Sequence, residues 1–100
     1  MAALFVLYAH DKAGKLADRM AARPKHLEHL ASLGARLKVA GPILDQATGD
    51  PCGSLIIFEA ENLAAAEAFA QADPYALSDL FDQVTVSPWR AAVGAWAASA

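Results

Sequence analysis

Two kinds of short strand-like segments alternate along this chain. Residues 4–9 and 55–58 are continuously apolar, which is typical of strands that are covered on both faces. Residues 36–39 and 84–87 instead alternate polar and apolar side chains, which is typical of strands with one exposed face. We therefore expect four strands, and the pattern allows the last one to continue toward Val93.

Segments with a helical spacing of apolar residues separate these strands. Residues 12–34 are predicted to be helical. Pro24 is predicted to divide them into a short first piece and a main helix that begins at the proline, because proline is favoured at the first helical position. Gly34 is well placed to end this helix. Asn62 is predicted to cap a second helix over residues 63–72, because its side chain can accept a hydrogen bond from the first turn.

The remaining segments are predicted as turns and loops. Pro74 should end the second helix, because the residue before a proline, here Asp73, is pushed out of the helical conformation. A short helix or turn is expected over residues 75–81. Residues 41–53 are rich in Gly, Pro and Asp and are expected to form a loop.

The predicted order of elements is β-α-β-β-α-β, the split βαβ or ferredoxin-like arrangement. We therefore expect an α+β fold with one four-stranded antiparallel sheet, two main helices on one face, and a single domain over residues 1–100. The apolar strands at 4–9 and 55–58 would then have a second face that no helix covers. A homodimer through that face is expected, since a large exposed apolar patch is unusual on a monomer. The small residues at 94–100 are expected to fray.

Composition narrows the possible partners. The chain is 56% apolar with a formal net charge of -3, and its Lys and Arg residues are scattered, so no nucleic-acid partner is expected. No run of about 18 strongly apolar residues is present, so no membrane span is expected. A start without basic residues favours the cytoplasm over export. Cys52 is the single cysteine, so an intrachain disulfide is impossible, and no neighbouring cation would activate its thiol.

Two histidines lie three residues apart in the predicted main helix. Leu27, Leu30 and Leu33 form the apolar stripe of that helix. His26 projects within about 40° of the centre of the stripe and His29 about 100° from it, so His26 should face the sheet and His29 the solvent. Because the two directions diverge and no third ligand is evident, no metal site is expected. His26 is thus either a boundary histidine with one hydrogen bond or a functional group.

Other polar residues have both a structural and a functional interpretation. Asp73 either bonds backbone groups of its own turn or pairs with His26 as a dyad for proton transfer. Tyr75 either packs or presents a phenol to a pocket, and Arg23 is either a solvated charge or a binding group for an anion. The His10-Asp11 segment that ends the first strand is either a simple turn or a source of side chains that reach a pocket.

Five motifs, in this order and spacing, resemble the YCII-related (YciI-like) family and cover nearly the whole chain. They are Leu7-Tyr8-Ala9-His10-Asp11-Lys12, Arg23-Pro24-Lys25-His26-Leu27, Ala40-Gly41-Pro42, Ala72-Asp73-Pro74-Tyr75 and Val84-Thr85-Val86-Ser87-Pro88-Trp89. The resemblance implies a dimeric fold of the α/β-barrel kind and an active site built on a His–Asp pair, which corresponds to His26 and Asp73. The predicted substrate-binding residues lie in the same motifs and are Arg23, Tyr75, Gly41 and Pro42.

The resemblance also implies a type of reaction. A relative in the family is associated with dehydrochlorination of a chlorinated hydroxyquinol, and muconolactone isomerases share the fold; these are proton transfers on small oxygenated rings without a cofactor. We therefore expect a cofactor-free lyase or isomerase acting on a small phenolic or anionic molecule. The alternative is a non-catalytic dimeric module that binds a small molecule. Residues 43–52 and those after 92 depart from the family pattern, and loops set specificity, so the substrate itself is not predicted.

Overall fold

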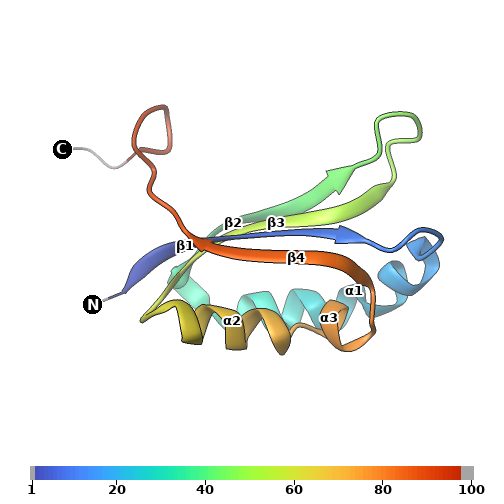
Figure 1. Ribbon diagram of the computed structural model, residues 1–100, viewed down its shortest axis with the longest axis horizontal. Coiled ribbons are helices and arrows are strands. Elements are labelled where there is room, and N and C mark those ends of the chain that lie inside the picture. The colour runs from blue at the N-terminus through green and yellow to red at the C-terminus, as the bar shows by residue number, and fades with distance from the viewer. Residues whose placement is uncertain (1, 98–100) are drawn as a thin grey trace.

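The computed structural model describes residues 2–97, in which one antiparallel sheet carries helices on a single face (Figure 1). The sheet order is β2-β3-β1-β4, so the two continuously apolar strands are central, and the α+β ferredoxin-like fold is confirmed. The strands are β1 (Ala3–Asp11), β2 (Leu37–Leu44), β3 (Pro51–Ala60) and β4 (Phe81–Pro88). The helices are α1 (Leu16–Ala31), α2 (Leu63–Gln71) and the short α3 (Pro74–Leu77), with a 3₁₀ turn at Gly34–Arg36.

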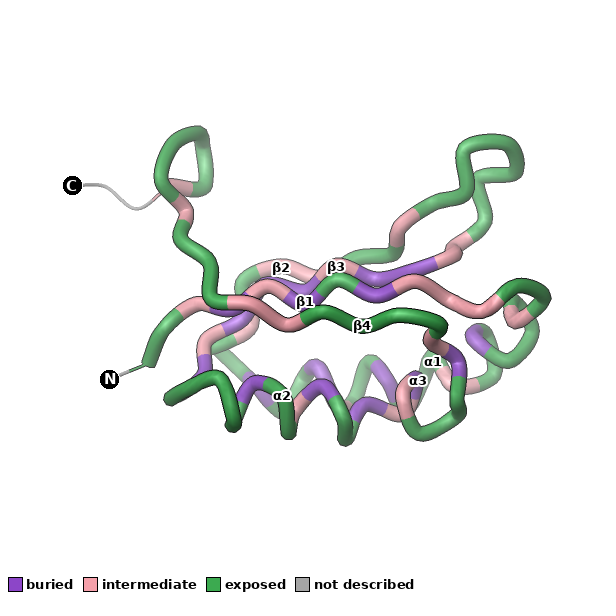
Figure 2. Tube along the Cα trace, viewed as in Figure 1, coloured by how far each residue is buried: buried purple, intermediate pink, exposed green. Residues whose placement is uncertain are grey.

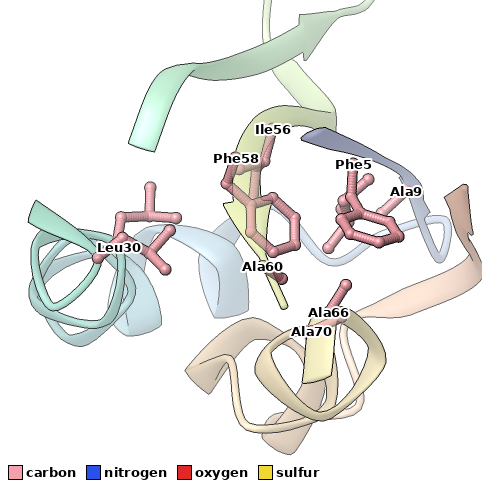
Figure 3. Close-up of a cluster of buried hydrophobic side chains, with 10 residues drawn as sticks. Phe5, Ala9, Leu30, Ile56, Phe58, Ala60, Ala66 and Ala70 are labelled. Atoms are coloured by element: carbon pink, nitrogen blue, oxygen red, sulfur yellow. The ribbon is translucent and has the colours of Figure 1, made fainter. Parts of the chain in front are cut away.

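The core lies between the sheet and the two longer helices. Phe5 of β1 and Phe58 of β3 are partners in the antiparallel register, and their ring centroids lie 6.5 Å apart. Ala66 and Ala70 of α2 belong to the same buried cluster and face these rings (Figure 3). Their small side chains let the helix lie close to the sheet. Figure 2 shows that the buried positions collect between the two layers.

The opposite face of the sheet is covered by no helix within residues 2–97 (Figure 1). Val6 and Tyr8 of β1 and Leu55 of β3 point to this side, because they alternate with the buried residues of their strands. The chain after β4 leaves on the same side of the sheet, and Trp96 in that segment is 72% exposed. We call this surface the open face; it is where the homodimer is expected.

Helix α1 differs from its prediction, because it continues through Pro24 instead of beginning there. A proline inside a helix removes one N–H and crowds the preceding turn, which normally costs about 3 kcal/mol. The helix is held on both sides of the proline, by buried polar contacts of Arg19 before it and of His26 after it. These contacts offset the cost, so the rule that a proline breaks a helix does not hold here. Gly34, with a φ of 57°, follows the helix and opens the 3₁₀ turn.

The predicted loop over residues 41–53 is also wrong, since most of it is strand. β2 runs to Leu44 and β3 begins at Pro51, so six residues connect them. Pro42 fits because β2 is an edge strand, where a missing N–H breaks no ladder bond. In the turn, the pKa of Asp45 is lowered because its carboxylate accepts backbone N–H groups of the turn and thus favours the charged form.

The two helices that follow β3 both begin with a capping side chain, and their positions agree more closely with the prediction. Asn62 caps α2, and its side-chain oxygen accepts the backbone N–H of Ala65 at 2.8 Å. The helix or turn expected over residues 75–81 is α3, and the residue that caps it is Asp73.

The end of β4 is shorter than the pattern allowed. The strand stops at Pro88, which has no N–H for a further ladder bond, so the continuation toward Val93 is wrong. Within the segment predicted to fray, residues 94–97 form a turn, and residues 98–100 lie outside the described part of the chain. Among the described residues, no helix is long and apolar enough to cross a membrane.

Gly53 of β3 lies where there is no room for a side chain. This residue pairs with both β1 and β2, and a Cβ atom placed on it would collide with the backbone carbonyl oxygen of Ala9. A glycine is therefore required where the strands meet. The next residue, Ser54, is buried on the helix side of the sheet.

Candidate functional site

The structure brings His26 of α1 and Asp73 together. The Nδ1 atom of His26 lies 2.8 Å and 2.9 Å from the two carboxylate oxygens of Asp73. Only 8% of the histidine side chain and 2% of the aspartate side chain are exposed. The predicted contact within hydrogen-bond reach is thus confirmed, and helix phase correctly placed His26 on the inner side of α1.

Asp73 bonds a backbone group of its own turn, as one of its two interpretations predicted, and also contacts His26. It is the N-cap of α3, and its Oδ1 atom accepts the backbone N–H of Tyr75 at 2.9 Å. The carboxylate is therefore fixed by the helix end before it meets the imidazole. An ionised carboxylate only accepts hydrogen bonds, so Nδ1 of His26 donates to it, and in a neutral imidazole Nε2 then carries a free lone pair. Within residues 2–97, Nε2 has no hydrogen-bond partner.

Tyr75 lies flat against the imidazole. The ring centroids of Tyr75 and His26 are 3.8 Å apart with an interplanar angle of 12°. The ring of Phe81 packs on Tyr75 in a T-shaped arrangement, with the two centroids 6.1 Å apart. Burial raises the pKa of Tyr75 above its ordinary value, partly opposed by the charges of Arg19 and Arg23. The phenol is therefore a hydrogen-bond donor at neutral pH. Among the described residues, its hydroxyl has no hydrogen-bond partner.

Sequence reasoning missed a third buried group, Arg19 of α1. Its Nη1 atom donates to the two oxygens of Asp11 at 2.9 Å and 3.0 Å, and its Nη2 atom donates to the hydroxyl of Ser54 at 2.8 Å. Its guanidinium carbon lies 4.6 Å from the ring centroid of Tyr75. The side chains of the ion pair are only 5% and 6% exposed. Asp11, the last residue of β1, therefore belongs to the buried polar cluster around Arg19 and is not part of a simple turn.

A cavity of about 240 Å³ lies beside these groups, between α1 and the edge strand β2. All four predicted substrate-binding residues line it. Asp73 does not line the cavity and is connected to it through its hydrogen bond with His26. Arg23 is exposed at the cavity, and none of the described residues forms an ion pair with it. The lining residues include Arg19, Arg23, His26, Gly41, Pro42, Ser54 and Tyr75.

The spacing of Arg19, Arg23 and His26 contains a signal that could have revealed the site. Residues four and seven positions apart share one face of a continuous helix, so the two arginines and the histidine point to the same side. The prediction that the main helix begins at Pro24 hid this relation, because it placed Arg19 in a separate piece. Reading α1 as one helix would have found all three.

His29 is only partly exposed and contacts α2, whereas the prediction turned it toward solvent. Its Nε2 atom lies 2.8 Å from the backbone oxygen of Phe69, and its ring stacks on the Phe69 ring with centroids 4.0 Å apart. The side chain therefore docks α1 on α2, away from the cavity. Within residues 2–97, no three His, Cys, Asp or Glu side chains gather in a way that could hold a metal ion.

A larger hollow of about 590 Å³ lies on the open face. Its charged lining residues are Lys38, which pairs with Glu59 at 2.9 Å, and Arg90. The lining of this larger hollow has no acid–base pair. The smaller cavity beside His26 is therefore the better candidate for chemistry. The other lining residues are mainly apolar: Leu4, Val39, Ile57, Trp89, Ala91 and Trp96.

Comparison with known proteins places these features in a family. The family model of the YCII-related domain matches residues 3–90. The protein YciI of Escherichia coli is 42% identical over 94 residues, which cover 87% of this chain and 96% of that protein. An uncharacterised protein of Haemophilus influenzae is 37% identical over 93 residues, covering 86% of this chain and 95% of its own length.

Solved structures extend the comparison. The 5-chloro-2-hydroxyhydroquinone dehydrochlorinase of Burkholderia phenoliruptrix, solved in complex with 2,5-dihydroxybenzoquinone, is 35% identical with a TM-score of 0.82. The match covers 87% of this chain and 93% of that one. A putative antibiotic biosynthesis monooxygenase from Nitrosomonas europaea, at 13% identity and a TM-score of 0.55, covers 93% of this chain and 100% of its own and shares the fold alone.

Proposed function

Because the chain belongs to the YCII-related domain family, we propose that it is a cofactor-free lyase or isomerase that moves a proton on a small phenolic or anionic molecule. The observation that carries this proposal is the pairing of His26 with Asp73 at a cavity, with Nε2 left free. That arrangement supplies a general base whose tautomer is fixed by a carboxylate. The relative named as a dehydrochlorinase supports the reaction class.

The chemistry follows from these positions. Nε2 of His26 removes a proton from the bound molecule, and the carboxylate of Asp73 stabilises the imidazolium that forms. In a lyase reaction, the electron pair left behind forms a new double bond while an anion such as chloride departs with its bonding electrons. In an isomerase reaction, the imidazolium instead returns the proton to another atom of the same molecule. The side chains alone supply the acid and the base in both cases.

The size and charge of the cavity indicate a single-ring ligand. Its volume of about 240 Å³ lies below the roughly 300–1,000 Å³ of sites for drug-sized molecules. Arg23, which forms no ion pair with another described residue, offers a cation for an oxyanion, and the hydroxyl of Tyr75 can donate to a ring oxygen. Gly41 and Pro42 of β2 form the opposite wall. A small hydroxylated ring, in part ionised, fits these features.

Turnover by paired histidine variants tests the proposal. Chlorinated and non-chlorinated hydroxyhydroquinones are assayed for product formation and chloride release, with 2,5-dihydroxybenzoquinone as a binding probe. His26→Gln should lower turnover by at least about 100-fold, the usual contribution of a general base. His29→Gln is the matched control, because it lies one turn further along α1 but contacts α2, and it should retain turnover within a few-fold.

Two outcomes contradict the proposal. If the panel binds at the cavity without turnover, the protein is a small-molecule-binding module, the main alternative for this fold. If turnover occurs and His26→Gln leaves it unchanged, the base lies elsewhere. Selective loss in His26→Gln with retention in His29→Gln is the result that supports a lyase or isomerase.

We also propose that the protein acts as a homodimer through the open face. The support is an apolar surface on the two central strands that no described helix covers. Large apolar patches on soluble proteins usually mark an interface, and a second copy of the same face completes a closed two-fold contact. The cavity lies on the helix side of the sheet, so the proposed interface leaves it open to ligand.

A further inference from the structure

Arg19 is held from three sides. Its guanidinium joins Asp11 of β1 and Ser54 of β3, and it contacts the ring of Tyr75 of α3. The residue is only 4% exposed. A planar guanidinium can satisfy such a set of partners in one fixed orientation, whereas an ammonium group cannot. The position of Arg19 is therefore determined by the sheet and not by its own flexible stem.

From Arg19, direct contacts lead to the proposed base. The guanidinium contacts the Tyr75 ring, and the Tyr75 ring stacks on the imidazole of His26 at 3.8 Å. A stacked neighbour restricts rotation of the imidazole plane about its side-chain bonds. The hydrogen bond to Asp73 fixes one edge of the same imidazole, so the two contacts together define the direction of Nε2.

The charge of Arg19 is already balanced within the protein. Asp11 accepts two hydrogen bonds from it, and both partners are almost fully buried. A buried ion pair is seldom the most stable solution, because desolvation of both charges offsets their attraction. Arg23 is the exposed cation at the cavity and is better suited to capture an anion. Arg19 is thus left with a geometrical role.

We propose that Arg19 is a positioning residue: it holds the ring of Tyr75 and, through that ring, the plane of the His26 imidazole so that Nε2 points into the cavity. This inference rests on the proposed function for its catalytic consequence. Its geometrical part stands on the contacts alone. Small displacements of a catalytic group can lower rates strongly, which makes such support valuable.

Two variants test the role without removing the buried charge. Arg19→Lys keeps a cation beside Asp11 but cannot reach Ser54 and lie on Tyr75 at the same time. Ser54→Ala keeps both Arg19 and Asp11 and removes only one anchor, so it serves if the lysine variant does not fold. The ring proton and nitrogen signals of His26 are measured by NMR, because the stacked Tyr75 ring shifts them by its ring current.

His29 is an internal control for the NMR measurement, since its ring stacks in the same way on Phe69 and is remote from the cavity. We expect both variants to move the His26 signals and to leave those of His29 in place. If the protein converts one of the assayed compounds, Arg19→Lys should lower kcat for that compound by about 10-fold or more, with a smaller change in KM. Binding of 2,5-dihydroxybenzoquinone should weaken less than kcat falls.

The outcomes separate this inference from the proposed function. Unchanged His26 signals in a folded Arg19→Lys variant overturn the positioning role, and so do equal movements of the His26 and His29 signals, which indicate a general structural role. Selective movement of the His26 signals in a protein without turnover supports the positioning role and contradicts the proposed enzymatic function.

Discussion

Two histidines of this chain are each hydrogen bonded to another side chain, on opposite faces of the sheet. His26 is buried against the carboxylate of Asp73 on the helix side. His10 lies on the open face, where its Nε2 atom and the hydroxyl of Tyr8 are 2.6 Å apart in an exposed pair. The first pair has a charged partner, shielded from water, and leaves Nε2 free at a cavity. The second has a neutral partner and uses its Nε2 for the bond.

The comparison separates a hydrogen-bonded histidine from a candidate catalytic one. A short distance alone does not distinguish the two pairs, since both are well within hydrogen-bond reach. What distinguishes them is the partner's charge, the burial of the pair and the free nitrogen. These differences predict unequal energetic effects when each pair is broken.

The largest effect is expected from Asp73→Ala. This change leaves the buried imidazole of His26 without its partner and removes the cap of α3. Loss of the partner of a buried hydrogen-bonding group costs up to about 3 kcal/mol, and loss of a cap adds about 1 kcal/mol. Urea unfolding of the variant and the wild type measures the difference.

Tyr8→Phe is the matched change on the open face, and it breaks the exposed pair with His10. It should alter the free energy of unfolding by less than about 1 kcal/mol. Equal effects of Asp73→Ala and Tyr8→Phe would show that burial and charge do not separate the two pairs.

An intermediate effect is expected where the open face meets a second copy. Leu55→Glu places a charge among the apolar residues of that face and should weaken the dimer by about 100-fold, or roughly 2.7 kcal/mol. Sedimentation velocity should give about twice the 10.5 kDa chain mass for the wild type. Leu77→Glu is the control, because Leu77 is 73% exposed on α3. A monomeric wild type at tens of micromolar would contradict the proposed interface.

The smallest effect concerns the phenol beside His26. Because the pKa of Tyr75 is raised on folding, the folded protein keeps this proton to higher pH than the unfolded chain. Stability from this source is complete below about pH 10 and is lost as the pH rises toward the folded pKa. Tyr75→Phe should therefore lose less stability than the wild type as the pH rises above about 10, and match the wild type at neutral pH. Thermal unfolding across the alkaline range measures this; parallel curves would contradict it.

The strands and the His26–Asp73 contact could be predicted because local pattern and tertiary structure agree there. The apolar runs of β1 and β3 match their central places in the sheet. Helix phase is sufficient to turn His26 inward. A proline is sufficient to turn Asp73 out of the preceding helix.

The errors arose where distant contacts override local preference. Pro24 lies inside α1 because the helix is held by buried contacts on both sides of it. Pro42 lies inside β2 because that strand happens to be at the edge. His29 faces Phe69 of α2. A helical wheel of α1 gives no information on where α2 packs, so this contact could not be predicted. Arg19 was missed as a direct consequence of the first of these errors.

Gly53 limits how this cavity can be altered by evolution or by design. Any side chain at that position would push β3 away from the Ala9 carbonyl and would displace the neighbouring Ser54, one of the anchors of Arg19. Saturation mutagenesis should therefore find almost no tolerated residue there. Met20 also lines the cavity and is 52% exposed, so new ligand preferences are more readily obtained from substitutions at that position.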